Sequence, residues 1–202
     1  MTLPETSIQL PGLPGVPQST HQGVWRLEAG GLHGSALPET DLFLDPIGDV
    51  RKLDAAMLLF EPDAEFTLGA CVEVGFQGTF DAGVLVLYQD ESNWAKLCFE
   101  FSPQRQPMVV SVVTRGVSDD CNSVVIGGHR VFLRLGRIGR GYGFHYAAGA
   151  EGPWHLVRAF GLAPLPVKAG FLVQSPMGQG CEVRFNDIFY RPLALQSLRS
   201  GE

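Results

Sequence analysis

The stretch FDAGVLVLYQDESNWAKLCFEFSPQRQPMVVSVVTRGVSDDCN, residues 80–122, decides the fold of this chain, with three apolar runs separated by two turns. Residues 108–115 are mostly β-branched, which is typical of a strand buried between neighbours. In residues 94–101 the two-residue period of a strand divides the side chains between two faces. One face is apolar and belongs to a core, and the other carries Trp94, Lys96, Cys98 and Glu100.

Similar apolar runs, bounded by Gly, Pro, Asn and Asp, continue on both sides of this stretch. They predict further strands at residues 25–27, 42–44, 56–60, 66–76, 130–138, 143–147, 154–160, 167–174 and 182–190. A strand beginning about every ten residues is typical of an all-β sandwich or barrel. We expect little helix, with residues 49–56 as the only candidate, and we read residues 30–41 as a loop.

The organisation along the chain is simple. Residues 1–22 are interrupted by four prolines and predict an irregular arm without strand pairing. Residues 23–191 form one domain, and residues 192–202 form a polar, partly helical C-terminal tail. Asp119 and Asp120 are expected in a turn that caps its own backbone.

Composition narrows the class of protein. The 202 residues include 15 Lys and Arg against 21 Asp and Glu, a net charge of −6, which argues against nucleic acid as a partner. The beginning of the sequence resembles no signal peptide, and no run of 18 apolar residues exists, so neither secretion nor a membrane association is expected. The four widely spaced cysteines predict free thiols in a cytoplasmic protein.

Several segments resemble the successive conserved segments of the DUF1349 family: FDAGVLVLYQDESNWAKLCFE, VVSVVTRGVSDD, VFLRLGRIG, YGFHYAAGAEGPWHLVRAF, GFLVQSP and VRFNDIFY. This resemblance covers about residues 40–191. It implies a concanavalin A-like jelly roll, in which two antiparallel sheets stack and one has a concave face. The family includes a yeast member associated with regulation of enolase, and relatives of the fold bind or cleave glycans. Such an analogy of fold does not choose among these functions.

Catalytic motifs are weak. Jelly-roll glucanases place their carboxylates on alternate residues of one strand, and residues 61–65, EPDAE, have that spacing. Pro62 removes a donor from the middle of such a strand, so a turn leading into Phe66 is expected instead. No Gly-x-Ser-x-Gly motif occurs, and Gly136-x-x-Gly139-x-Gly141 is read as a hairpin turn.

Metal and cofactor sites are not expected. The five histidines show no metal-binding spacing, although His145 and His155 could be neighbours on adjacent strands. Asp119 and Asp120 could ligate a hard cation, but their loop lacks the oxygen-rich cage that calcium needs. Asp187 resembles a position near calcium sites of lectin-like folds, by analogy alone.

One set of polar and aromatic residues remains a candidate ligand site. We expect it to line one concave sheet, and it comprises Trp94, Lys96, Glu100, Arg134, His145, Tyr146, Arg158 and Gln174. A sugar can stack on an aromatic ring while its hydroxyls take hydrogen bonds from charged and amide groups. A structural role, with Lys96 and Glu100 in a cross-strand charge network and Trp94 packed under a loop, is an equal alternative.

Three hypotheses about function follow. The first is a non-catalytic binding module for a carbohydrate or a small polar metabolite. The second is a glycoside-processing enzyme or an isomerase that uses Glu100 and a histidine, His145, as acid and base. The third is a protein-interaction module, which predicts a broad exposed apolar patch. The sequence favours binding over catalysis.

Overall fold

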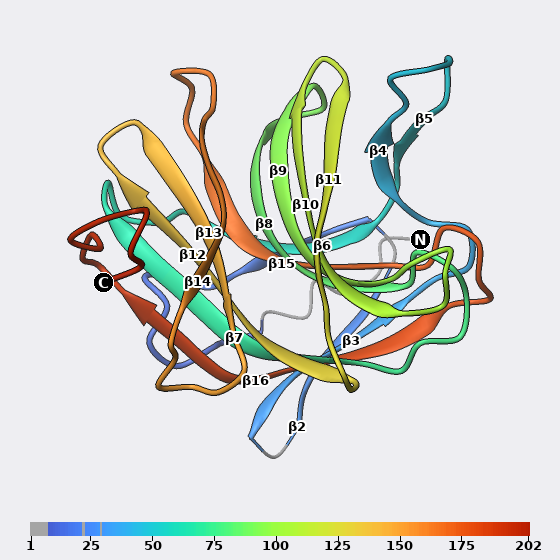
Figure 1. Cartoon of the computed structure of the whole chain (residues 1–202), viewed down its shortest axis with the longest axis horizontal. Coiled ribbons are helices and arrows are strands. Elements are labelled where there is room, and N and C mark those ends of the chain that lie inside the picture. The colour runs from blue at the N-terminus through green and yellow to red at the C-terminus, as the bar shows by residue number, and fades with distance from the viewer. Residues whose placement is uncertain (1–7, 22, 29) are drawn as a thin grey trace.

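The structure is a computed structural model that describes residues 8–21, 23–28 and 30–202. All the regular secondary structure of these residues is β, and every strand pairing is antiparallel. Sixteen strands form two seven-stranded sheets and one small hairpin (Figure 1). The predicted all-β sandwich of two antiparallel sheets is confirmed.

Sheet A contains the three predicted strands of residues 80–122, followed at one edge by a fourth strand that begins at Ser118. In spatial order its strands are β1 (Gln18–Thr20), β6 (Ala56–Phe60), β15 (Lys168–Gln174), β8 (Ala82–Asp90), β9 (Asn93–Phe101), β10 (Pro107–Arg115) and β11 (Ser118–Val125). Sheet B contains β14 (His155–Gly161), β13 (Gly141–Ala147), β12 (Arg130–Ile138), β7 (Phe66–Val74), β16 (Cys181–Arg191), β3 (Gly31–Ala36) and β2 (Val24–Glu28).

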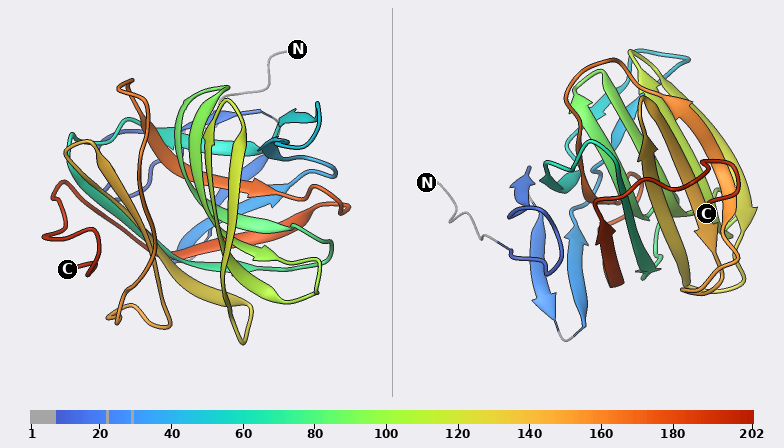
Figure 2. Two further views of the ribbon diagram at one scale, coloured as in Figure 1. Left: turned by 45° about the horizontal axis from the view of Figure 1, so that its top comes forward. Right: turned by 90° about the vertical axis from the view of Figure 1, so that its left-hand side faces the viewer.

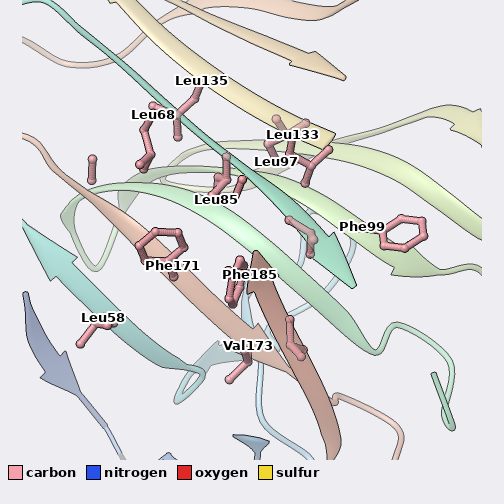
Figure 3. Close-up of a cluster of buried hydrophobic side chains, with 14 of the residues drawn as sticks. Leu58, Leu68, Leu85, Leu97, Phe99, Leu133, Leu135, Phe171, Val173 and Phe185 are labelled. Atoms are coloured by element: carbon pink, nitrogen blue, oxygen red, sulfur yellow. The ribbon is translucent and has the colours of Figure 1, made fainter. Parts of the chain in front are cut away.

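The main core lies between the two sheets. The core joins side chains of both sheets: Leu97, Phe99 and Phe171 from sheet A face Leu133 and Phe185 from sheet B. All five residues are fully buried. Figure 3 shows these side chains converging from strands of both sheets. The predicted apolar face of residues 94–101 is therefore the face of sheet A that packs on sheet B.

The opposite face of sheet A has a smaller core of its own. Figure 1 shows β8–β11 curving so that their hollow side faces a hairpin formed by β4 (Leu42–Leu44) and β5 (Arg51–Leu53). Leu42 and Leu44 pack there against Val84, Val86 and Val112, among others. The hairpin is tied to the edge strand because Ser118 Oγ accepts a hydrogen bond of 2.9 Å from the Leu44 amide. The concave face of sheet A is thus largely covered.

A bulge in β16 changes which of its side chains face the core. Pairing with β7 shifts register between Asn186 and Phe189, and Asp187 has a φ of 48°. Val183 and Phe185 face the core before the bulge, whereas Phe189 and Arg191 face away from it afterwards. One extra residue in a strand reverses the two-residue alternation.

Several local predictions were wrong. Residues 31–36 form strand β3 rather than a loop, residues 51–53 form β5 rather than a helical turn, and Asp119 and Asp120 lie in edge strand β11. Residues 18–20 of the predicted arm pair with β6. Pairing outweighs weak local propensity in each case: β3 and β1 pair with the distant strands β16 and β6, whereas β5 and β11 form hairpins with the strands just before them, β4 and β10.

The C-terminal segment, residues 192–202, contains no helix and crosses the outer face of sheet B, as Figure 2 shows. Thr67 Oγ1 donates a hydrogen bond of 3.1 Å to the Leu193 carbonyl, and the segment continues over β12 and β13. No helix among the described residues is long and apolar enough to cross a membrane. All four cysteines are free thiols; Cys71, Cys98 and Cys181 are buried, as expected, whereas Cys121 is exposed.

Candidate functional site

Five polar residues form a cluster on the concave face of sheet A, which we call the concave-face cluster. Strand β9 supplies two of them because its even-numbered residues face away from sheet B, and the others come from β15, from β11 and from the residue before β4. The members are Asp41, Lys96, Glu100, Asp120 and Gln174.

Lys96 is the best-anchored member of the cluster. Its side chain is 2% exposed, and its Nζ lies 2.9 Å from Gln174 Oε1 and 3.3 Å from Asp41 Oδ1. Gln174 Nε2 in turn donates to the Phe80 carbonyl at 3.3 Å, which holds the carboxamide in place. The ammonium also lies 5.4 Å from the ring centre of Trp94. A buried cation with these partners is held in one geometry.

Glu100 is unlike its neighbours. It is 8% exposed, and among the described residues no side chain or backbone donor binds its carboxyl group. Burial raises the pKa of Glu100 to about 8; the charge of Lys96 opposes this shift, and the carboxylates of Asp120 and Asp41 add to it. Glu100 therefore carries a proton at neutral pH and can donate a hydrogen bond.

Asp120 and Asp41 form the accessible rim of the cluster. Asp120 is exposed, and the Asp41 side chain is 15% exposed. Partial burial raises the pKa of Asp120, Lys96 opposes this, and the charge of Asp41 contributes to it. At neutral pH the cluster thus offers acceptors at the rim and a protonated carboxyl group, a carboxamide and an ammonium deeper in the sheet.

Trp94 does not form an open aromatic platform. Its side chain is 0% exposed, it packs in the smaller core, and its buried indole Nε1 has no hydrogen-bond partner in the described part of the chain. A sugar cannot stack on this ring without displacing the residues that cover it. The expected aromatic contact at Trp94 is therefore not available in this structure, because the β4–β5 hairpin packs over the concave face.

Arg134 and His145 lie on sheet B rather than beside Lys96. They are paired neighbours on β12 and β13, their side chains face away from the main core, and both are buried under residues 192–202. Arg134 Nη2 donates to the Gly201 carbonyl, and His145 Nε2 lies 2.7 Å from the Leu198 carbonyl. The expectation that they share a sheet with Glu100 is wrong, because β12 pairs with β7, and β13 pairs with β12, in sheet B.

His145 is a neutral imidazole at physiological pH. Burial lowers the pKa of His145 to about 4; the hydrogen bond to Leu198 opposes the shift, and the charge of Arg134 adds to it. Since a carbonyl can only accept, Nε2 carries the hydrogen and Nδ1 is bare. Its place on the other sheet prevents it from acting with Glu100 as an acid and base pair.

Tyr146 lies on β13, and Arg158 lies on the neighbouring edge strand β14. Tyr146 packs against the main core and stacks on His155, with ring centres 5.0 Å apart. Arg158 Nη2 lies 2.9 Å from Asp119 Oδ2, and Nη1 donates to the Asp119 carbonyl at 3.1 Å. This double contact joins the edge strand of sheet B, β14, to the edge strand of sheet A, β11. Of the eight predicted ligand-binding residues, the concave face of sheet A thus brings together only Trp94, Lys96, Glu100 and Gln174.

The three aspartates considered as metal ligands do not converge. Asp119 pairs with Arg158, Asp120 faces the concave-face cluster, and Asp187 lies in the β16 bulge on sheet B. Within residues 8–202, apart from the two undescribed positions, no group of three or more His, Cys, Asp or Glu side chains could hold a metal ion. The EPDAE segment lies in the connection between β6 and β7.

Residues 19–193 match the model of a family described as "Protein of unknown function (DUF1349)". This chain belongs to the DUF1349 family. The match covers both sheets, and it confirms the resemblance carried by the sequence segments. A comparison with curated proteins finds no significant match.

Solved structures resemble this DUF1349 chain in fold. A functionally unknown protein from Saccharomyces cerevisiae superposes with a TM-score of 0.79 at 20% identity, over 90% of this chain and 97% of the yeast chain. A carbohydrate-binding module, CBM66 from Bacillus subtilis, gives a TM-score of 0.54 at 13% identity, over 86% of this chain and 94% of the module. At such identities these likenesses show the fold alone.

A glycoside hydrolase also contains this fold as a part. A mutant of the GH43 protein BlXynB from Bacillus licheniformis gives a TM-score of 0.67 at 15% identity, over 85% of this chain. The DUF1349 chain spans only 34% of that protein. A match to a third of a hydrolase does not assign its activity to this chain.

Two residues that matter in these sites were missed from the sequence. Asp41 directly follows Thr40, which forms an isolated β-bridge with Ser175. This bridge brings Asp41 close to Lys96. Trp154 packs with Arg134 on the outer face of sheet B, with the guanidinium 4.1 Å from the ring centre. Neither contact leaves a signal in the local sequence, since both join segments that are distant along the chain.

Proposed function

We propose that this protein is a non-catalytic binding module whose concave-face cluster binds a carbohydrate or a similarly polyhydroxylated small metabolite. The observation that carries the proposal is Glu100, a protonated carboxyl group, 8% exposed, with no partner among the described residues. Buried polar groups are normally hydrogen-bonded, so an unpartnered one on a functional face is a candidate for ligand contact.

The chemistry of the cluster favours a neutral ligand rich in hydroxyl groups. Asp41 and Asp120 at the rim accept hydrogen bonds and repel anions, while Glu100 and Gln174 can exchange hydrogen bonds with a hydroxyl group. Lys96 is already bound to Asp41 and Gln174, so it orders these acceptors. The fold likeness to the carbohydrate-binding module CBM66 supports the same class of ligand.

A glycan array followed by thermal-shift titration of each hit tests the proposal. A ligand at 100 times its Kd is expected to add about 2.7 kcal/mol of stability. Glu100→Ala should abolish the shift, whereas Glu73→Ala, at a carboxylate on the outer face of sheet B, should leave it unchanged. Absence of any glycan or polyol hit, or a hit that Glu100→Ala does not affect, would argue against this site.

The raised pKa of Glu100 also favours a second candidate, a glycoside-processing enzyme in which Glu100 is the general acid. A buried carboxylic acid that is protonated at neutral pH can give its proton to a leaving group, and Asp120 is a carboxylate coupled to it. Release of nitrophenol from aryl glycosides, lost in Glu100→Gln, would favour catalysis. Binding of glycans without turnover would favour the module.

A further inference from the structure

A cavity lies on the side of the molecule opposite the concave-face cluster, between the outer face of sheet B and residues 193–196 and 202. Its volume is about 510 Å³, and its walls include Phe132, Trp154 and Phe189 together with Arg134 and Arg191. The β16 bulge places Phe189 and Arg191 on this face. Phe189 lies directly over Gly69 of β7, whose missing side chain leaves room for the ring.

Two guanidinium groups in this cavity lack a counter-ion. Arg134 is 6% exposed, it stacks 4.1 Å from the Trp154 ring centre, and its Nε has no hydrogen-bond partner in the part of the chain described. Arg191 lies 5.7 Å from the Phe189 ring centre. Neither arginine forms an ion pair with any described carboxylate, although Glu151, Asp187 and Glu202 also line the cavity.

The electrostatics agree with this geometry. Burial lowers the pKa of Arg134 to about 10, and the like charge of Arg191 adds to the shift, so the two cations act on each other. Arg134 therefore remains charged at neutral pH. Arg134 is buried, and its partners, the Gly201 carbonyl and the Trp154 ring, do not neutralise its charge, so an anion placed between it and Arg191 would be stabilised.

We propose that this cavity binds a small carboxylate that carries a ring, with the carboxylate between Arg134 and Arg191 and the ring against Trp154 and Phe189. Guanidinium groups bind carboxylates with two parallel hydrogen bonds, and aromatic walls accept a flat apolar surface. Arg134 and Arg191 both line the cavity, and the buried Nε of Arg134 has no hydrogen-bond partner among the described residues. An aromatic acid and an acidic sugar share this chemistry.

This site is independent of the concave-face cluster. Arg134 belongs to sheet B and Glu100 to sheet A, and their side chains point to opposite outer faces of the sandwich. Failure of one proposal leaves the other intact, since each can be tested with a variant that does not touch the other site.

Isothermal titration of the full chain with sodium benzoate and with sodium glucuronate, at constant salt, tests the inference. Benzyl alcohol and glucose serve as neutral controls. We expect one or both carboxylates to bind, and the neutral controls not to bind at this cavity. Preference for benzoate would identify an aromatic acid as the ligand class, and preference for glucuronate an acidic sugar.

Arginine variants complete the test. Arg191→Gln, at an exposed position that should not perturb folding, is expected to weaken carboxylate binding about tenfold, because a charge-assisted hydrogen bond is lost. Arg134→Gln should weaken it at least as much. Arg184→Gln, on the same strand but outside the cavity, is the matched control. Absence of carboxylate binding, equal binding of the neutral controls, or unchanged binding by Arg191→Gln would overturn the proposal.

Discussion

At the scale of single residues, the molecule places ionisable groups where burial controls their charge. Lys96 stays charged because Asp41 and Gln174 receive its hydrogen bonds, whereas Glu100 has no such partner among the described residues and holds a proton. His145 shows the reverse case, a base that burial keeps neutral. Burial therefore has a different result for each residue, according to its partners: Lys96 is charged, the Glu100 carboxyl group is protonated, and the His145 imidazole is neutral.

Lys96→Met should destabilise the fold by about 3 kcal/mol, because it leaves Asp41 and Gln174 partly buried without their donor. Urea unfolding measures this loss. Lys168→Met, at an exposed position on β15, is the control and should change the free energy of unfolding by less than about 0.5 kcal/mol. The double variant Lys96→Met, Asp41→Asn should recover part of the loss. Equal stability of wild type and Lys96→Met would mean that the buried contacts contribute nothing.

Glu100 predicts a pH dependence of stability. Its pKa rises from an ordinary value of 4.5 to about 8 on folding, so between these values the folded state binds the extra proton. Stability from this group is complete below pH 4.5 and is lost as the pH rises to 8, by about 1.4 kcal/mol per pH unit. Glu100→Gln should remove this slope. Chemical unfolding of both proteins from pH 4.5 to 8.5 gives the comparison, and identical slopes would contradict the assignment.

At the scale of elements, the bulge of β16 determines what the outer face of sheet B presents. Without it, the alternation that places Phe185 inward would also place Phe189 and Arg191 inward. The bulge turns both side chains outward, with the Phe189 ring over Gly69, and so adds both to the cavity wall beside Arg134. One extra residue thus divides β16 into two parts: before the bulge its odd-numbered side chains face the core, and after the bulge they face the cavity.

Gly69→Ala tests this arrangement. The Phe189 ring already occupies the place of the new methyl group, so we expect a loss of about 1–3 kcal/mol in thermal or urea unfolding. Combining it with Phe189→Leu should cost less than the sum of the two single changes, because the shorter side chain makes room. Gly127→Ala, in an open loop, is the control. Strict additivity would show that the ring does not rest on Gly69.

At the scale of the whole molecule, the two sheets form one core and should unfold together. Phe171 of sheet A and Phe185 of sheet B meet with ring centres 5.0 Å apart, and both are 0% exposed. The Arg158–Asp119 contact closes one edge between the same sheets, although it is partly exposed and contributes little. Stability therefore resides in the shared apolar layer between them.

Phe171→Ala is expected to destabilise the protein by about 3–5 kcal/mol and to lower the transitions of both sheets equally. Trp94 reports on sheet A and Trp154 on sheet B, so single-tryptophan proteins that retain one or the other can follow each sheet by fluorescence. Coincident urea transitions would support a single cooperative unit. Separate midpoints would indicate that the sheets unfold independently.

Much of this organisation could be read from the chain before its structure. The two-residue alternation in β9 correctly separated Leu97 and Phe99 from Lys96 and Glu100, since the sides of a strand follow from backbone geometry alone. The spacing of apolar runs predicted a sandwich, and the local segments identified the DUF1349 family. Gln174 was also placed correctly beside Lys96.

The remainder depended on contacts between distant segments, which local patterns do not encode. Strand order sent Arg134 and His145 to sheet B, a hairpin buried Trp94, and the bulge reversed the direction of Phe189 and Arg191. A strand's alternation specifies which residues share a side, but only its partners specify which sheet it joins and what covers that side. The alternation could therefore be predicted from the sequence, whereas both candidate sites exist only because folding brings distant segments together.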